Sequence, residues 1–104
     1  MDLNLHLVRY LVAVVDEGHF GRAAARLYVS APALSQQVRK LERAVGAELV
    51  DRTAHPVRPT EAGARFLAEA REALAAADRA VAAVESYRRE VATTLRLGFM
   101  TASA

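Results

Sequence analysis

Residues 20–46 read FGRAAARLYVSAPALSQQVRKLERAVG, and this stretch decides the fold. Phe20, Ala23, Ala24 and Leu27 recur at the spacing of one helix face, and the small side chains among them let a neighbouring helix approach closely. A connection of about three residues follows, and then a second, longer helical pattern begins. Two helices joined by so tight a turn match a helix-turn-helix arrangement.

The second helical pattern has an apolar side and a polar, basic side. Ser30 is a good N-cap, Pro32 is tolerated in a first helical turn, and Gly46 is a stop residue. The apolar stripe steps by four, three and four residues, through Leu34, Val38, Leu41 and Val45. The opposite side carries Ser35, Gln36, Arg39, Lys40 and Arg43. If the stripe is buried, the polar side must face solvent.

The segments that flank this pair complete a small domain. Between Leu3 and Val15 apolar residues follow helical spacing, and Gly18 offers a C-terminal stop. Residues 48–59 contain two prolines and no helical period, which predicts an extended hairpin or a loop anchored to the core by an apolar residue at each end. These anchors are Leu49 and Val57.

A long helix is predicted after the hairpin. Thr60 has the character of an N-cap, Glu61 suits the positive end of the helix dipole, and no proline interrupts the run to about Val91. The helix carries an apolar stripe with steps of three and four residues, interrupted at Arg88, which is typical of a helix that pairs with a partner. The predicted dimerisation residues are Leu67, Ala70, Leu74, Ala77, Val81 and Val84.

The last part of the chain has a different pattern. Leu95, Leu97 and Phe99 alternate with other residue types, which predicts a β-strand. Because a lone strand is not stable in water, we expect the natural protein to continue past Ala104. The predicted fold class is therefore mainly α, a winged helix-turn-helix followed by a long dimerisation helix and one trailing strand. The predicted domain bounds are 1–59, 60–92 and 93–104.

Composition narrows the classes of function. The chain has 104 residues, of which 53% are hydrophobic and 25% charged, as expected of one compact domain with an appendage. No apolar run is long enough for a membrane span and no signal peptide is present, so we expect a cytoplasmic protein. Zero cysteines exclude disulfides and thiolate chemistry. The three histidines lack metal-ligand spacing and the serines lack a nearby base, so neither a metal site nor a catalytic site is predicted.

The polar side of the 31–45 helix has the chemistry of a DNA reader. Base edges in the major groove require short polar or bidentate side chains near the N-terminus of a helix, and Ser35 and Gln36 qualify. Arg39 and Arg43 lie further along, where phosphates are the expected neighbours. The net charge is only +2, so basic character must come from local placement. An ordinary amphipathic helix with a solvated basic face is the alternative interpretation.

At this point the residues resemble the N-terminal region of LysR-type transcriptional regulators. The matching positions are Phe20-Gly21-Arg22-Ala23-Ala24, Leu27, Val29-Ser30, Pro32-Ala33-Leu34-Ser35, Leu41-Glu42, Gly46, Leu49, Arg52-Thr53 and Thr60-Glu61-Ala62-Gly63. The resemblance covers residues 1 to about 99. It implies a bacterial winged helix-turn-helix, a dimerising linker helix and the first strand of an effector-binding domain. The remainder of that domain, absent from this chain, is implied to bind a small-molecule effector, and no cofactor is expected in residues 1–104.

The resemblance also implies a set of DNA-binding residues. Ala31, His19, Gly21, Gln36 and His55 depart from common family choices, so the operator preference is expected to be unusual. Gln36 suits adenine better than guanine, and Ala31 offers an apolar contact to a thymine methyl group. The full predicted set is Arg22, Ser30, Ala31, Pro32, Leu34, Ser35, Gln36, Arg39, Arg52, Thr53, His55 and Arg58.

The expected function is sequence-specific binding to double-stranded promoter DNA, with the 31–45 helix in the major groove and the wing at the minor groove. A homodimer would read an inverted repeat with half-sites about 34 Å apart. The resemblance implies a tetramer for the full-length protein and possible contact with RNA polymerase. A coiled-coil interaction module without specific DNA binding is one alternative. A small enzyme or ligand-binding domain is another, but the sequence shows no convergent polar groups for a pocket.

Overall fold

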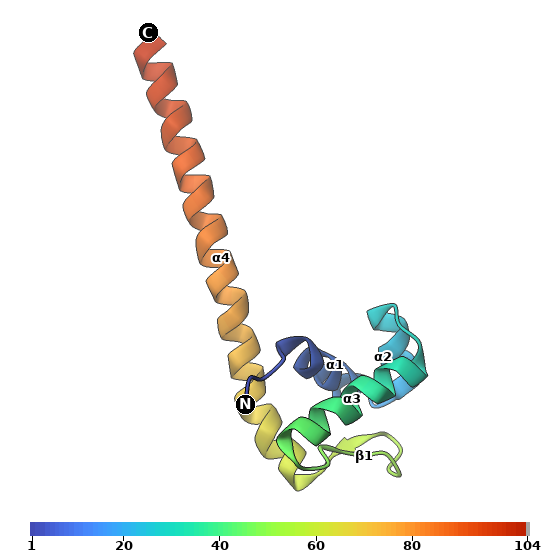
Figure 1. The fold of residues 1–104 in the computed structure, drawn as a ribbon. Helices are drawn as coiled ribbons and strands as arrows, with labels where there is room; N and C mark the ends of the chain where they lie inside the picture. Colours follow the sequence, from blue (N-terminus) through green and yellow to red (C-terminus); the bar gives the residue numbers. More distant parts are fainter. Residues whose placement is uncertain (104) are drawn as a thin grey trace. The chain divides into compact units, whose positions relative to one another are not determined.

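The structure is a computed structural model that describes the backbone of residues 1–103 and the side chains of residues 1–98. It contains two compact units, Met1–Leu74 and a second that begins at Ala75. The first unit, here called the head, holds three helices, a two-stranded hairpin and the first turns of a fourth helix (Figure 1). The elements are α1 (Leu5–Glu17), α2 (Phe20–Leu27), α3 (Ala31–Val45), β1 (Val50–Asp51), β2 (Arg58–Pro59) and α4 (Glu61–Ser103).

Local capping chemistry sets the end of α1 and both ends of α3, as the sequence predicts. The Oγ of Ser30 accepts a hydrogen bond from the backbone N–H of Ala33 at 3.2 Å and so begins α3. Gly18 ends α1 with a φ of 67°, and Gly46 ends α3 with a φ of 78°. Residues with a β-carbon rarely adopt this left-handed conformation, so glycine stops both helices at low cost.

The core of the head lies where α1, α2 and α3 pack together. Leu34 and Val38 of α3 are fully buried, Leu41 is 1% exposed, and Val45 packs partly buried at the end of the same stripe. From α1, Val8, Leu11 and Val14 are also fully buried. The predicted apolar stripe is therefore confirmed. Since this stripe is locked against two other helices, the opposite side of α3 is held in one orientation.

The two-stranded hairpin is anchored to the helices of the head by buried side chains and a backbone hydrogen bond. Strands β1 and β2 pair antiparallel, with Val50 opposite Pro59. The predicted anchors Leu49 and Val57 are buried, and the backbone N–H of Val57 donates to the carbonyl of Gly18 at 2.9 Å. The hairpin is thus tied to the turn between α1 and α2, and the predicted wing is confirmed as a short hairpin.

The start of α4 belongs to the head. The Oγ1 of Thr60 accepts from the backbone N–H of Gly63 at 2.9 Å and donates to the carbonyl of Glu48 at 2.6 Å, so the predicted N-cap also ties α4 to the hairpin. Further along, Arg71 forms an ion pair of 2.8 Å with Asp16 of α1. These contacts hold the first turns of α4 in the head.

The predicted dimerisation stripe divides into two parts. Leu67, Ala70 and Leu74 are 5%, 4% and 8% exposed and belong to the core of their own head, so they are not available to a partner helix. For these three residues the dimerisation prediction is wrong, because the apolar face of the first turns covers the head core instead. Val81 and Val84 are 60% and 58% exposed.

The predicted trailing strand is wrong as well. Helix α4 continues through residues 93–98, past the predicted end near Val91, to Ser103. A helix satisfies its own backbone hydrogen bonds, whereas a strand needs a neighbour, and residues 1–103 supply none here. The side chain of Phe99, and all of Ala104, lie outside the described residues.

A substitution at Gly63 tests the close approach of α4 to the hairpin. A β-carbon at Gly63 would lie against the backbone of Leu49, 2.8 Å from its carbonyl carbon. The backbone of Leu49 and that of α4 cannot move apart easily. We therefore expect Gly63→Ala to lower the free energy of unfolding of the head by about 1 to 3 kcal/mol, measured by thermal or urea unfolding. Gly98→Ala is the control, because a β-carbon added there would meet no atom within 4 Å beyond its own helix backbone, and it should leave the stability of the head unchanged. An unchanged Tm for Gly63→Ala would contradict the packing described.

Candidate nucleic-acid interface

The N-terminal half of α3 presents a compact polar surface. Gln36 and Arg39 are exposed and Ser35 is half-buried. Ser30 and Pro32, at the start of the helix, are exposed too. Pro32, Gln36 and Arg39 lie on the side of α3 away from the buried stripe, Ser35 lies at the edge of that side, and Ser30 lies at the N-terminal end. Ala31 is half-buried at the edge of that face.

Leu34 does not belong to this surface. The sequence prediction included it among the DNA-binding residues, but its side chain is fully buried in the core of the head. Its position in the apolar stripe of α3 explains this, because residues four apart on a helix share a face with Val38. The role of Leu34 is to fix the helix.

Three predicted wing residues are accessible. Thr53, His55 and Arg58 are exposed on the hairpin, and Arg22 is exposed on α2. An open groove of about 930 Å³ lies between the C-terminal half of α3 and the hairpin. Its cationic lining residues are Arg39, Arg43, Arg52 and Arg58.

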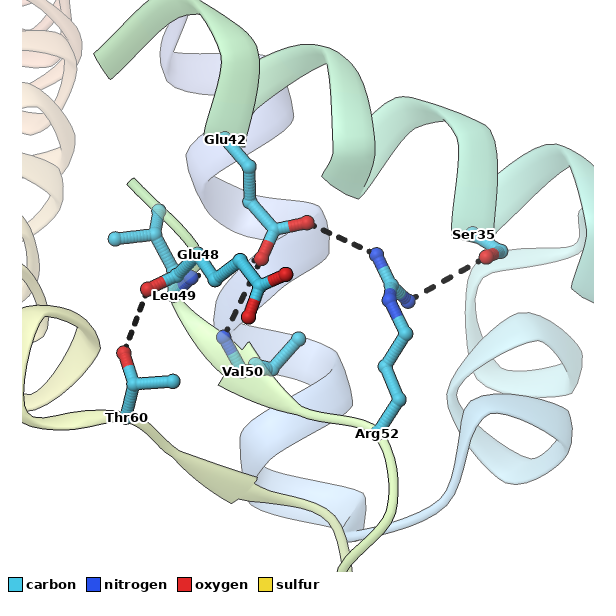
Figure 2. A network of polar contacts seen from close by, with 7 residues as sticks. All are labelled: Ser35, Glu42, Glu48, Leu49, Val50, Arg52 and Thr60. Carbon is cyan, nitrogen blue, oxygen red and sulfur yellow. Dashed lines mark hydrogen bonds and ion pairs between the residues drawn. The ribbon is translucent and has the colours of Figure 1, made fainter. Parts of the chain in front are cut away.

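Arg52 differs from the other wing residues, because its guanidinium group turns inward (Figure 2). Nη2 lies 3.0 Å from Oε1 of Glu42, and Nη1 donates to Oγ of Ser35 at 3.4 Å. The guanidinium carbon also lies 4.8 Å from the centre of the Phe20 ring, a cation–π geometry. The side chain is only 23% exposed. In the structure Arg52 connects the wing to α3 and α2, and its assignment as a wing residue that meets DNA stays a prediction.

Glu42 holds this network together, and sequence reasoning assigned it no role in the site. It is a buried carboxylate, 9% exposed, on the core side of α3. Its Oε2 accepts from the backbone N–H of Leu49 at 2.7 Å and lies 3.5 Å from that of Val50, while Oε1 pairs with Arg52. A sequence signal existed: Glu42 lies four residues after Val38, so a charge stands at the edge of an apolar stripe and requires a buried partner.

His19 has a structural role. Its Nδ1 accepts from the backbone N–H of Arg22 at 3.1 Å, which makes the imidazole the N-cap of α2. His19 therefore helps to begin α2. In the described part of the chain, no group of three or more acidic, histidine or cysteine side chains is placed to hold a metal ion.

A short turn shapes the start of the wing tip. Oδ1 of Asp51 accepts from both the backbone N–H and the hydroxyl of Thr53, at 2.9 and 2.6 Å. These hydrogen bonds, the hydroxyl one foremost, hold the pKa of Asp51 below its ordinary value of 3.8, because they favour the charged carboxylate. One exposed carboxylate thus fixes the turn that leads from β1 into the wing tip.

A three-helix head whose second and third helices meet in a tight turn, followed by a hairpin wing, defines a winged helix-turn-helix protein. Residues 5–64 match the family model described as bacterial regulatory helix-turn-helix protein, lysR family. The chain belongs to this family. Across residues 1–103, no helix has both the length and the apolar character needed to cross a membrane.

Two relatives illustrate the similarity. The uncharacterized HTH-type transcriptional regulator YnfL of Escherichia coli (strain K12) is 49% identical over 104 residues, a match that covers 100% of this chain and 35% of YnfL. The HTH-type transcriptional regulator TfdT of Cupriavidus pinatubonensis is 39% identical over 95 residues, which cover 91% of this chain and 42% of TfdT. The chain therefore spans less than half the length of either relative.

Solved structures agree with the fold. The complex of BenM_DBD with catB site 1 DNA has a TM-score of 0.74 and 38% identity, and the match covers 77% of this chain and 86% of that one. Vibrio fischeri DarR in complex with DNA has a TM-score of 0.79 and 28% identity, with 86% of this chain and 30% of that chain covered. The winged helix-turn-helix architecture predicted from the sequence is confirmed.

Thr53→Val tests the cause of the lowered pKa of Asp51. The variant removes the hydroxyl donor, so the pKa of Asp51 should rise toward 3.8, while the backbone donors keep it from rising fully. Because the folded-state pKa is depressed, the turn stabilises the fold above pH 3.8 and loses that contribution as pH falls through the lowered value. Carboxyl NMR titration measures this shift, with Thr93→Val on α4 as control. An Asp51 titration identical in both variants would exclude the hydroxyl as the cause.

Proposed function

We propose that this chain is the DNA-binding and dimerisation segment of a LysR-family transcription regulator. In this proposal α3 enters the major groove of promoter DNA and the wing lies at the adjacent minor groove. One observation carries it: the apolar stripe of α3 is locked in the core, so Ser35, Gln36 and Arg39 are presented together on a rigid helix beside a hairpin. The DNA-bound relatives with the same architecture support the proposal.

The interface divides into two kinds of contact. Gln36 has an amide that can pair bidentately with adenine, so it is the residue we assign to base reading. Arg39, Arg43 and Arg58 line the groove between α3 and the hairpin, where a DNA strand would bring its phosphates. The activity is binding rather than chemical turnover, and no catalytic residue is assigned.

The second unit supplies the dimerisation surface in this proposal. From Val81 onward α4 exposes large apolar side chains that a soluble helix would cover with a partner. The exposed residues of this surface are Val81, Val84, Val91 and Leu95, with Tyr87 at its edge. Ala77, half-buried, marks its beginning. Two heads joined in this way would read an inverted repeat with half-sites about 34 Å apart.

Further properties are proposed for the longer regulator to which such a segment belongs. There a small-molecule effector would bind outside residues 1–104, and the assembly would be a tetramer whose geometry changes with the effector and alters contact with RNA polymerase. The support for this is that the chain corresponds to only 35% of YnfL and 42% of TfdT. A regulator of this kind would act in the bacterial cytoplasm.

Substitutions at Gln36 and Arg39 separate the two kinds of contact. Gln36→Ala should weaken binding to the preferred duplex by about 1 to 3 kcal/mol and relax preference at one base pair. Arg39→Ala should weaken binding to all duplexes and reduce the slope of log K against log salt by about 0.9. Fluorescence anisotropy with duplexes selected by the wild-type chain from a random pool measures both effects. Selection of no preferred sequence by the wild type would support an interaction module without specific DNA binding.

Two aspartate substitutions separate the two parts of the α4 stripe. Val81→Asp should convert a dimer to a monomer in light scattering and leave the Tm of the head unchanged, because the charge stands in the exposed part. Leu74→Asp should destabilise the head by at least about 3 kcal/mol, since it removes a core side chain and buries a charge. A Val81→Asp protein of unchanged mass would place the dimer contact elsewhere.

A further inference from the structure

The hydroxyl of Ser35 has an unusual environment for a residue on the reading face. Its oxygen accepts a hydrogen bond from Nη1 of Arg52 at 3.4 Å, and within the described residues this is its one hydrogen-bond partner. A serine inside a helix commonly donates to the carbonyl four residues earlier, but Ser35 makes no such bond to Ala31. Among the described residues, the hydroxyl hydrogen therefore has no acceptor.

Arg52 is fixed in this position by the rest of the network. Its other terminal nitrogen, Nη2, pairs with Oε1 of Glu42 at 3.0 Å, and Oε2 of that carboxylate accepts from the backbone N–H of Leu49, just before β1 (Figure 2). The ring of Phe20 covers the guanidinium plane. Since arginine carries only donors, the nitrogen that faces Ser35 can never accept the serine proton.

These contacts determine the polarity of the hydroxyl. A serine hydroxyl has one donor hydrogen and two acceptor lone pairs, and in a free helix it can turn to meet either a donor or an acceptor. Here the cationic nitrogen occupies one of the two lone pairs and repels the hydrogen. The O–H is therefore favoured in directions away from Arg52, and Gln36 and Arg39 are exposed on the same helix.

We propose that Arg52 is a positioning residue that makes Ser35 a hydrogen-bond donor toward DNA. Ser35 then contacts an acceptor, either a base-edge acceptor (a purine N7, guanine O6 or thymine O4) or a phosphate oxygen. Because one lone pair is already used by Arg52, Ser35 is a weaker acceptor for the amino groups of adenine and cytosine than a freely rotating hydroxyl is. This inference rests on the proposed function, and it assigns Arg52 an indirect part in specificity in place of a phosphate contact.

Gln36, the next residue of α3, differs from Ser35 in its hydrogen-bonding polarity. Its amide carries both donors and an acceptor, and it has no hydrogen bond within the described residues that would fix one polarity. Adjacent positions on one helix therefore read DNA in different ways: Gln36 by a bidentate pattern and Ser35 by donation alone. Loss of one such hydrogen bond should lower the affinity for DNA about tenfold.

The first experiment is a double-mutant cycle with Ser35→Ala and Arg52→Lys. The probe is the duplex that the full wild-type chain selects from a random pool, together with its variants carrying each base pair at the position that Ser35→Ala no longer distinguishes. Lysine at position 52 retains a charge for Glu42 but lacks the planar fork that reaches both partners. We expect Arg52→Lys to bind the disfavoured pair within about twofold of the favoured one, and to have no further effect in the Ser35→Ala background. Independent, additive effects of the two substitutions would overturn the inference.

The second experiment identifies the acceptor. Single 7-deazapurines remove one base N7, and single methylphosphonates remove one phosphate charge and acceptor, at each place in the selected duplex. The modification that weakens wild-type binding about tenfold but leaves Ser35→Ala unaffected marks the partner, and the type of modification distinguishes base from phosphate. A base contact through O6 or O4 instead of N7 would show as a loss of base preference without sensitivity to either modification. Equal sensitivity of the two proteins to all modifications, with base preference also unchanged in Ser35→Ala, would overturn the inference.

The third experiment separates positioning from direct phosphate contact. The double variant Glu42→Gln with Arg52→Met removes both buried charges together, so that neither is left unpaired. The positioning role predicts an unchanged salt slope and the loss of the Ser35 contact that the second experiment identifies, whereas a slope reduced by about 0.9 would make Arg52 a phosphate ligand. Circular dichroism establishes that each variant is folded, and if this one is not, Arg52→Lys carries the test. Failure of the wild-type chain to select any sequence would refute the proposed function; selection with Ser35 and Arg52 uncoupled would refute this inference alone.

Discussion

Burial of one side of α3 is the constraint on which the head depends. Leu34, Val38 and Leu41 lose nearly all of their solvent exposure against α1 and α2, and each such burial stabilises the fold by about 2 kcal/mol. A helix held in this way cannot rotate about its axis without exposing the stripe. The orientation of the polar face is therefore a consequence of core packing, and the proposed reading of DNA inherits its geometry from three apolar side chains.

The Glu42 carboxylate couples that helix to the wing. Burying an ion costs several kcal/mol unless hydrogen bonds and an opposite charge compensate. Here the backbone of Leu49 and the Arg52 guanidinium supply that compensation, and in doing so they set the base of β1 and the direction of the Arg52 side chain. The described residues leave no buried side-chain polar atom without a partner. One acidic residue thus holds the backbone just before β1 and sets the direction of the Arg52 side chain.

Helix α4 shows how one periodic pattern serves two environments. Its apolar residues recur at steps of three and four residues from Leu67 to Val84. Those up to Leu74 complete the head core, and those from Val81 are exposed. A spacing of three and four residues states that one face of a helix is covered, but it does not state whether the cover is the same chain or another. The sequence prediction treated the whole stripe as one surface for this reason.

The sequence by itself determined the features that depend on residues close together in the chain. The N-caps at Ser30 and Thr60, the stops at Gly18 and Gly46 and the phase of the α3 stripe follow from local backbone geometry, and the structure confirms them. Other features were decided only by the tertiary structure, because they depend on which distant groups meet. A long arginine side chain has many rotamers, so only the buried Glu42 carboxylate and the Phe20 ring turn Arg52 inward. The strand predicted beyond residue 93 needed a partner strand, and without one among the described residues the helix continued.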